Sequence, residues 1–321
     1  MTQGASSVTG VAARKQEGRM APQYDTFAGQ RNIWMLWLQD AEAAPEMVRV
    51  CHQSWLEKNP GWRVNFLSQE TVGDHLTEDF RREIFSLDLP PQKVANLIRL
   101  HLISRHGGVW ADADCYCVRP LDDWLPQHMA GGFLAFRFQA DAWLEKNRHR
   151  PLARLFGKSQ DRILSNWFLV GLAGNWLSET FLRHHLALLK TGKFGRQRGI
   201  LRLATTVLRR NAYLASKLSD ARLLRVMGKF PYFIFHYHFA SLVLNDPAFD
   251  LAWQKVPKLI GRNMLRYSKS LHLPADDQFV DDFSGRGIAP VFKLHWNRSE
   301  GATVVGSRLR WLLDQRRVYR Q

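Results

Sequence analysis

The sequence predicts an α/β fold, with a largely parallel sheet and helices on both of its faces. Two observations support this prediction. Short apolar runs alternate with longer helical patterns through the first half of the chain, in the order strand, helix, strand, helix, strand. The half after about residue 175 is mostly helical. With 321 residues, 45% of them hydrophobic, the chain has ample core for one large domain or two modest ones.

The expected strands are short apolar runs. They cover residues 32–38, 64–67, 109–111 and 132–136. The first helix opens at Pro45 and runs to about Lys58, where Asn59-Pro60-Gly61 stops it. A later helix, at about 93–106, follows two prolines. Its apolar residues circle most of the helix axis, so we expect it to be buried on nearly all sides.

The net charge of +16 is concentrated in two segments. Residues 190–229 contain eleven Lys and Arg residues and a single acid, Asp220. The segment from Arg308 to the end holds five arginines and one acid, Asp314. Two basic patches on a nearly neutral body suggest a surface that meets an anionic partner. A nucleic-acid-binding protein is therefore one hypothesis, and it predicts basic residues around an aromatic cleft.

Location and redox state follow from simple features of the chain. Residues 1–29 are polar, small and mixed in charge, so we expect a disordered leader without a secretory signal. The most apolar run, residues 230–244, is too short to cross a membrane and contains two histidines. The three cysteines, Cys51, Cys115 and Cys117, cannot form an even disulfide framework. We therefore expect reduced thiols and a cytoplasmic protein.

A pair of aspartates is the most informative feature of the chain. Asp112 and Asp114 follow a helix, a Gly107-Gly108 turn and a short apolar strand. Residues i and i+2 of a strand point to the same side, so the two carboxylates should converge. At about 5 Å they repel by roughly 3 kcal/mol, and a divalent cation between them, Mg²⁺ or Mn²⁺, would remove that cost. The alternative is a solvated turn without function.

Two further groups of residues could act with these aspartates. Asn96 and Arg99 share a face of the helix at 93–106. A buried guanidinium needs an anion, which is either a structural carboxylate or a ligand diphosphate. Lys293 and His295 lie together in an expected strand, where a histidine could be a third metal ligand and a lysine a phosphate partner. Ordinary packing is the alternative for that pair.

The chain resembles the bacterial capsular polysaccharide synthesis proteins, which are relatives of the DXD-motif glycosyltransferases that include the Och1-type mannosyltransferases. The matching pieces occur in the family's order over roughly residues 31–297. They are Ile33-Trp34-Met35-Leu36-Trp37, Ser54-Trp55, Asn59-Pro60-Gly61-Trp62, Asn96-Leu97-Ile98-Arg99, Gly107-Gly108, Asp112-Ala113-Asp114, Arg119-Pro120-Leu121, Ser165-Asn166-Trp167-Phe168, Phe235-His236-Tyr237 and Lys293-Leu294-His295-Trp296.

The resemblance implies a GT-A fold, a Rossmann-like mixed sheet that binds a nucleotide-sugar beside a divalent metal. It implies Asp114 as a direct metal ligand, Asp112 as a ligand directly or through water, and His295 as the residue that completes the shell. Arg99 would act in catalysis with the two aspartates. The donor-binding residues that it implies are Trp37, Asn96, Arg99, Asp112, Asn166, Lys293 and Trp296. Relatives usually have Asp where this chain has Asn96, so a hydrogen-bonding role is expected there.

Together these features predict a metal-dependent glycosyltransferase that moves a sugar from a nucleotide-sugar to a polysaccharide or lipid-linked acceptor, with retention of configuration. The expected domain spans residues 30–300, with a basic helical insertion at about 185–229 and a basic tail over 301–321. An amphipathic helix over 201–218 adds the hypothesis of peripheral attachment to the inner membrane face, against the alternative of an ordinary surface helix. A two-metal phosphohydrolase would need more clustered carboxylates.

Overall fold

A computed structural model describes residues 25–39, 42–137, 146–147, 150–157, 161–195, 199–257, 259–298 and 304–317. The strands are β1 (Asn32–Leu36), β2 (Arg63–Leu67), β3 (Gly108–Ala111), β4 (Cys115–Cys117), β5 (Phe133–Ala135), β6 (Phe168–Gly171) and β7 (Val291–Lys293). The helices of the first half are α1 (Glu46–Lys58), α2 (Glu78–Ser86), α3 (Pro91–His106) and α5 (Pro151–Phe156). Those of the second half are α6 (Trp176–Leu189), α7 (Gly199–Leu208), α8 (Ala212–Ser216), α9 (Ala221–Met227), α10 (Ile234–Asn245), α11 (Pro247–Gln254), α12 (Asp277–Phe283) and α13 (Arg308–Arg317).

A five-stranded mixed sheet, in the order β2-β1-β3-β6-β5, forms the centre of the molecule. The ladders from β1 to β2 and to β3 are parallel, whereas β6 runs antiparallel to both β3 and β5. The strands expected over residues 32–38, 64–67, 109–111 and 132–136 are present. The sheet is mixed, with two parallel and two antiparallel ladders where a largely parallel sheet was expected. The strand expected to hold both Lys293 and His295 ends at Lys293. The sequence analysis missed β6, because its four residues are all buried and so show no polar–apolar alternation.

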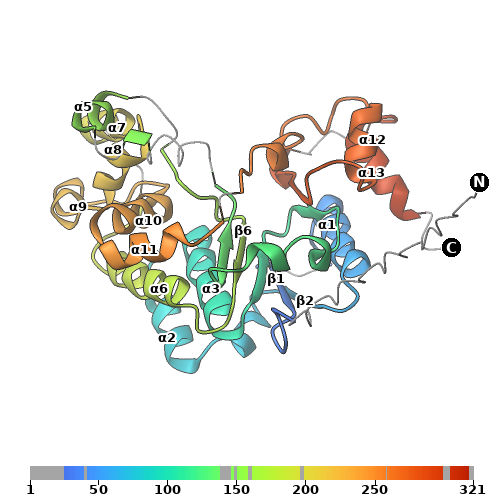
Figure 1. Cartoon of the computed structure of the whole chain (residues 1–321), viewed down its shortest axis with the longest axis horizontal. Coiled ribbons are helices and arrows are strands. Elements are labelled where there is room, and N and C mark those ends of the chain that lie inside the picture. Colours follow the sequence, from blue (N-terminus) through green and yellow to red (C-terminus); the bar gives the residue numbers. More distant parts are fainter. Residues whose placement is uncertain are drawn as a thin grey trace, which may run out of the picture.

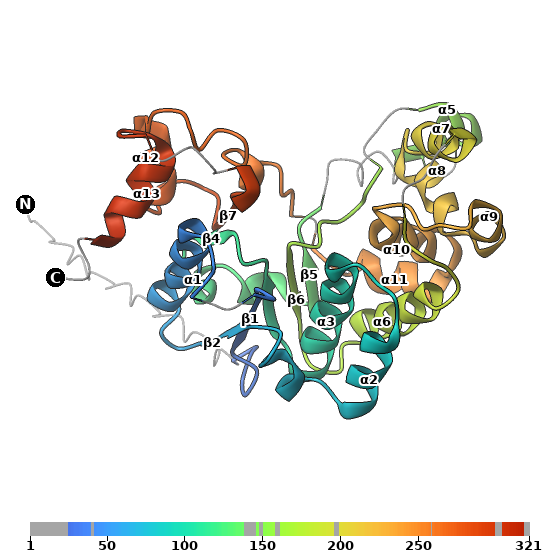
Figure 2. The ribbon, with the colours of Figure 1, turned by 180° about the vertical axis from the view of Figure 1, so that it is seen from behind.

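Helices cover both faces of this sheet, as the sequence predicts (Figure 1). Successive strand residues point to opposite faces, so Trp34 and Trp110 pack in the core formed with α3, α6 and α10. Ile33 and Val109 pack in the other core, which includes α1 and the C-terminal helices α12 and α13. The helices α5 to α11 form a helical lobe. This lobe and the α12–α13 end therefore lie on opposite sides of the sheet in both views (Figures 1 and 2).

The Gly107-Gly108 turn delivers β3 into the centre of the sheet. Both glycines have positive φ angles, 69° and 99°. A Cβ atom on Gly108 would lie 2.2 Å from the carbonyl oxygen of Asn32, so only glycine lets β3 approach β1 at this point. α3 leads into this turn and is buried along most of its length, as expected.

Three segments differ from the sequence-based expectation. Residues 1–24 of the expected leader lie outside the described residues, but Asp25–Gly29 form a turn that buries Phe27 against Trp62. The expected basic tail contains α13, whose Leu309 and Leu312 are buried in the core beside α1. In both cases apolar side chains outweigh the polar character of the surrounding sequence.

The expected helix over residues 201–218 is also wrong as a single element. α7 ends at Leu208, and α8 begins at Ala212. Asn211 caps α8, because its side chain accepts a hydrogen bond from the amide of Leu214. None of the helices in the described part of the chain is long and apolar enough to span a membrane. The three cysteines are free and buried, as predicted.

Buried histidines predict an acid-sensitive fold. Burial lowers the pKa of His101 to about 4 and, with the charge of His184, lowers the pKa of His238 to about 3. In the unfolded chain these groups bind a proton below about pH 6.5, so unfolding becomes more favourable as the pH falls through that value. The free energy of unfolding should fall by about 2 kcal/mol per histidine between pH 7 and pH 5. Urea unfolding at both pH values measures this change.

His101→Phe gives the matched comparison. His101 stacks on Phe80 with ring centroids 4.0 Å apart, and its Nε2 atom is buried without a hydrogen-bond partner. A phenyl ring keeps the stacking and cannot be protonated. The variant should therefore lose about 2 kcal/mol less than the wild type over the same pH range. Equal losses in the two proteins would mean that His101 does not contribute.

Candidate active site

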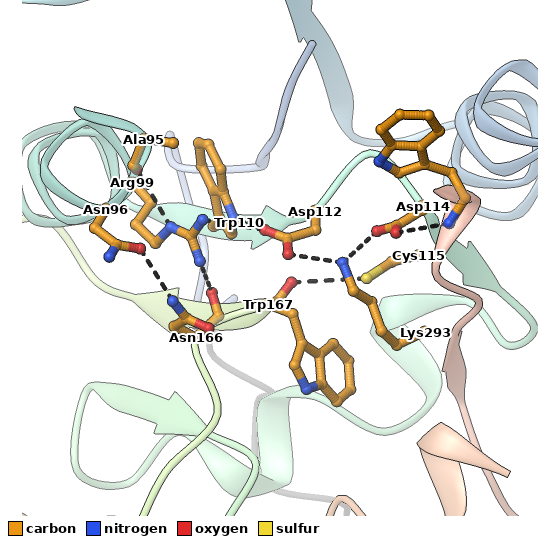
Figure 3. Close-up of polar contacts among 11 residues, drawn as sticks. Ala95, Asn96, Arg99, Trp110, Asp112, Asp114, Cys115, Asn166, Trp167 and Lys293 are labelled. Atoms are coloured by element: carbon orange, nitrogen blue, oxygen red, sulfur yellow. Dashed lines mark hydrogen bonds and ion pairs between the residues drawn. The ribbon is translucent and has the colours of Figure 1, made fainter. Parts of the chain in front are cut away.

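Asp112 and Asp114 converge, as predicted, but through a turn and not along a strand. β3 ends at Ala111, and the amide of Cys115 donates to the carbonyl oxygen of Asp112 to close the turn into β4. Both carboxylates then contact the same group, the Nζ atom of Lys293 (Figure 3). A continuous strand would also have paired these two carboxylates. The turn pairs them with Lys293 between them.

The β4–β7 ladder places Lys293 at this position, because Cys115 pairs with Lys293 across it. The Nζ atom lies 2.8 Å from Asp112 Oδ2 and also contacts Asp114 Oδ1. Burial by itself would lower the pKa of the ammonium group, but the two carboxylates raise it above its usual value. Burial likewise favours protonation of Asp112, but Lys293 and Arg99 outweigh it and hold the pKa of Asp112 below its usual range.

Arg99 contacts the other oxygen of Asp112. Its Nη2 atom lies 3.3 Å from Asp112 Oδ1, and its guanidinium stacks over the ring of Trp110 at 4.9 Å. The indole Nε1 of Trp110 donates to the same carboxylate oxygen at 2.9 Å. The sequence analysis did not single out Trp110 as a site residue. Its position two residues before Asp112, at the end of the same strand, was the signal.

Asn96, Arg99 and Asn166 form one end of the site (Figure 3). The side chain of Asn166 donates to Asn96 Oδ1 at 3.0 Å, and Arg99 donates to the Asn166 carbonyl oxygen. Asn96 therefore has the hydrogen-bonding role that its amide allows. In this structure the anionic partner of Arg99 is Asp112, which is the structural alternative that the sequence left open.

The segment from Lys293 to Trp296 wraps around Asp114. The amide of Leu294 donates to the Asp114 carbonyl oxygen at 3.0 Å, and the amide of Trp296 donates to Asp114 Oδ2 at 3.2 Å. His295 lies between them with a φ angle of 57°, the only positive value among the described residues other than glycine. Such a backbone conformation is uncommon and occurs often at functional sites.

Two tryptophans adjoin this segment. The rings of Trp37 and Trp296 meet edge to face with their centroids 5.2 Å apart. Trp296 is 36% exposed, so an aromatic surface is available beside Asp114. A chain of contacts therefore links every residue expected to bind a donor. It runs through Asn96, Asn166, Arg99, Asp112, Lys293, Asp114, Trp296 and Trp37, in this order.

The expected third metal ligand does not join the two carboxylates. No group of three His, Cys, Asp or Glu residues within the described ranges could hold a metal ion, and this includes His295. Two carboxylates do fit Mg²⁺ or Mn²⁺ when the remaining ligands are water and substrate phosphates. The Lys293 ammonium lies where such a cation would lie, so the residues fit a cation that takes the place of Lys293.

Comparison with known proteins identifies the family of this chain. The model of the capsular polysaccharide synthesis protein family matches residues 12–177, just over half of the chain. The chain belongs to this family. The matched region contains β1, α3 and the Asp112–Asp114 turn. Lys293 and Trp296 lie beyond it, so the structure adds residues from the second half of the chain to the family region.

Curated proteins share shorter stretches with this family member. It is 29% identical over 97 residues to a protein of Acanthamoeba polyphaga mimivirus named as an uncharacterized glycosyltransferase, covering 29% of the chain and 38% of the relative. It is 25% identical over 103 residues to HOC1 of Saccharomyces cerevisiae, also named as a glycosyltransferase, covering 30% of the chain and 26% of the relative. The chain thus spans well under half of either relative. The solved PaToxG glycosyltransferase aligns over 70% of this chain and 84% of its own at 12% identity, with a TM-score of 0.33.

Lys293→Met should destabilise the fold. The substitution leaves the buried Asp114 and the partly buried Asp112 without their shared cation, and removing one partner of a buried ion pair costs roughly 3–5 kcal/mol. We expect the free energy of unfolding to fall by about 3 kcal/mol at pH 7. Urea unfolding measures the change, and the exposed Lys255→Met is the control that should change it little. Equal stability of the two variants would show that Lys293 does not neutralise the aspartates.

Proposed function

We propose that this protein is a glycosyltransferase that moves a sugar from a nucleotide-sugar to a saccharide acceptor in the synthesis of a surface polysaccharide. The observation that carries the proposal is the cluster of Asp112, Asp114, Arg99 and Lys293 next to the Trp37–Trp296 pair. Membership of the capsular polysaccharide synthesis family and the glycosyltransferase names of the curated relatives support it.

Each part of the cluster has a role in this proposal. The exposed face of Trp296, beside Trp37, suits the flat nucleobase of a donor. Arg99 and Lys293 supply positive charge for the diphosphate that leaves when the sugar is transferred. Asn96 and Asn166 offer hydrogen bonds to sugar hydroxyl groups at the other end of the site. This arrangement corresponds to a GT-A type of site.

We infer that the transfer retains configuration. An inverting enzyme needs a general base for the acceptor hydroxyl. Asp112 is held by Lys293, Arg99 and Trp110, and Asp114 by Lys293 and the Trp296 amide. The contacts of Asp112 hold the pKa of its carboxyl group below the usual range, so Asp112 is a poor proton acceptor.

We also propose that donor binding depends on Mn²⁺ or Mg²⁺ held by Asp112 and Asp114. The bound cation would neutralise charge on the leaving diphosphate. Asp112 and Asp114 already carry two cationic partners, so a divalent ion without a diphosphate would leave the site with excess positive charge. Lys293 must then release the carboxylates and turn toward the phosphates. Metal and lysine should therefore compete for the same oxygen atoms.

Mn²⁺ titrations test the metal proposal. Calorimetry with UDP and GDP present should show Mn²⁺ binding to the wild type and none to Asp114→Ala, which loses one of the two carboxylates. Lys293→Met should bind Mn²⁺ at least about tenfold more tightly when nucleotide is absent, because no ammonium occupies the carboxylates. Equal Mn²⁺ affinity of Lys293→Met and the wild type would contradict the competition. Undiminished Mn²⁺-dependent sugar transfer by Asp114→Ala would contradict the metal site.

We further propose that the helical lobe docks on an anionic membrane, which would bring the donor site to a lipid-linked acceptor. α5 exposes Leu152 at 71% and Phe156 at 69%, and α7 exposes Leu203 at 63%. Both helices pack against α8. Apolar side chains exposed on neighbouring helices are typical of interaction sites. Anionic lipid fits here because the flanking segment is strongly basic.

Exposed basic residues of α7 and α9 support contact with anionic lipid. Arg209 is unsuitable, because it pairs with Asp161 at 2.8 Å and helps to hold the lobe together. Arg202 and Arg210 are exposed on the α7 side. On α9, Arg222 and Arg225 flank the exposed Val226. Each such cation near an anionic surface contributes about 1 kcal/mol to binding.

Flotation with vesicles tests the membrane proposal. The protein should float with vesicles of phosphatidylcholine and phosphatidylglycerol, not with phosphatidylcholine alone, and salt should weaken the binding. Changing Arg202, Arg210, Arg222 and Arg225 to Gln should abolish flotation, and so should Leu152→Ser with Phe156→Ser. The control removes four exposed arginines from other surfaces, namely Arg49, Arg63, Arg82 and Arg105. A wild type that stays with the soluble fraction at low salt would contradict docking.

A further inference from the structure

The loop before α10 carries an exposed aromatic ring with a lysine beside it. Tyr232 is 66% exposed, so its ring can be reached from solvent. The Nζ atom of Lys93 lies 4.3 Å from the centre of this ring and donates to the Tyr232 carbonyl oxygen. Lys93 comes from the first turn of α3, so the contact joins the sheet domain to the helical lobe. Neither residue belongs to the site described above.

The charge of Lys93 is not balanced by any carboxylate within the described part of the chain. Lys93 is only 5% exposed, and its contacts there are a carbonyl oxygen and the rings of Tyr232 and Phe194. Burial, together with the positive charge of Arg99, lowers the pKa of Lys93 to about 8. A buried cation of this kind is costly unless an anion pairs with it. Lys293, by contrast, has two carboxylates of its own.

More positive charge lies on the other side of the same loop. The guanidinium of Arg162 packs over the ring of Phe233 at 4.4 Å and pairs with Asp161 at 3.2 Å. His236, one turn further along, is buried with an Nδ1 atom that has no hydrogen-bond partner. Burial and the positive charges of Arg162, Lys93 and Arg99 all lower the pKa of His236. The His236 imidazole therefore responds to three cations, of which Lys93 and Arg99 come from α3 and Arg162 comes from the segment before β6.

Two chain segments connect this basic loop with the donor site, namely α3 and residues 162–166. Lys93 lies six residues before Arg99 on α3, a distance of about 9 Å along the helix. Arg162 lies four residues before Asn166, whose side chain and carbonyl oxygen contact Asn96 and Arg99. Figure 3 shows Asn96, Arg99 and Asn166 at the end of the site opposite Asp114. A second substrate that meets the donor sugar at this end would lie next to Lys93.

We propose that Tyr232, Lys93 and Arg162 form an acceptor subsite for a negatively charged saccharide. A pyranose ring packs its apolar face on the exposed Tyr232 ring, and its carboxylate or phosphate group pairs with Lys93. Arg162, which pairs with Asp161 on the other side of the loop, adds positive charge to the surroundings. The proposal rests on the proposed glycosyltransferase function and specifies the acceptor class, a saccharide that carries acidic groups.

Binding measurements on the full-length protein test this subsite. The probes are trigalacturonate, which carries carboxylates, glucose 1-phosphate, which carries a phosphate, and neutral maltotriose. By calorimetry and saturation-transfer NMR, at least one anionic probe should bind the wild type more tightly than maltotriose, and salt should weaken it. Binding of trigalacturonate alone would show that the acidic group of the acceptor is a carboxylate. Binding of glucose 1-phosphate alone would show that it is a phosphate.

Three variants make the test specific. Lys93→Gln should weaken the anionic probe about tenfold, because it removes the charge-assisted contact. Tyr232→Ala should weaken it as well, and loss of so exposed a ring should leave the fold intact. Lys255→Gln, an exposed lysine at the end of α11, should bind as the wild type does. If no anionic probe outbinds maltotriose, or if Lys93→Gln and Tyr232→Ala bind like the wild type, the subsite is wrong.

Titration of each variant with UDP and GDP separates this proposal from the one on which it rests. Tyr232→Ala should bind the nucleotides as the wild type does, because it lies outside the Asp112–Asp114 pocket. If neither nucleotide binds the wild type, the donor proposal fails while a charged saccharide can still bind at Tyr232. If nucleotides bind and the saccharide does not respond to the variants, only the acceptor subsite fails.

Discussion

The shared ion pair of Lys293 with Asp112 and Asp114 is the interaction on which the rest of the site depends. It joins residues 179 positions apart in the chain and fixes the small β4–β7 sheet against the end of β3. Two carboxylates in a buried turn repel one another, so this turn is stable only with a cation between them. The lysine provides that charge within the chain. The same contact positions the segment up to Trp296, and hence the aromatic surface next to Asp114.

The balance of charge in this cluster determines which net charge a ligand can add to it. Asp112 and Asp114 are matched by Arg99 and Lys293, so the cluster is neutral as it stands. A diphosphate adds negative charge and a divalent cation adds positive charge, and the two together preserve the balance that either alone would upset. Ligand binding at such a site is therefore expected to be cooperative between nucleotide and metal, with Lys293 as the group that changes partner.

The distribution of the remaining basic residues argues against the nucleic-acid hypothesis. That hypothesis needs cations around an aromatic cleft, but the Trp37–Trp296 pair adjoins a carboxylate, Asp114. The basic segment of α7 to α9 lies in the helical lobe, away from β4 and β7 (Figure 2). The proposed lipid contact rests on the exposed apolar side chains and basic flanks of this lobe, and the loop at Tyr232 contacts Lys93 of α3.

The sequence by itself determined the order of strands and helices and the Gly107-Gly108 turn, because apolar spacing and glycine requirements are local properties. The resemblance to the family supplied the group of residues expected at the site. It predicted neither the reversed direction of β6 nor the packing of α13, since both depend on surfaces contributed by distant segments. From the sequence we expected Lys293 to contact a phosphate, and we expected a metal cation to lie between the two aspartates. Only the tertiary structure decided that the β4–β7 register brings the Lys293 ammonium group between the two carboxylates, because a contact across 179 residues leaves no local signal.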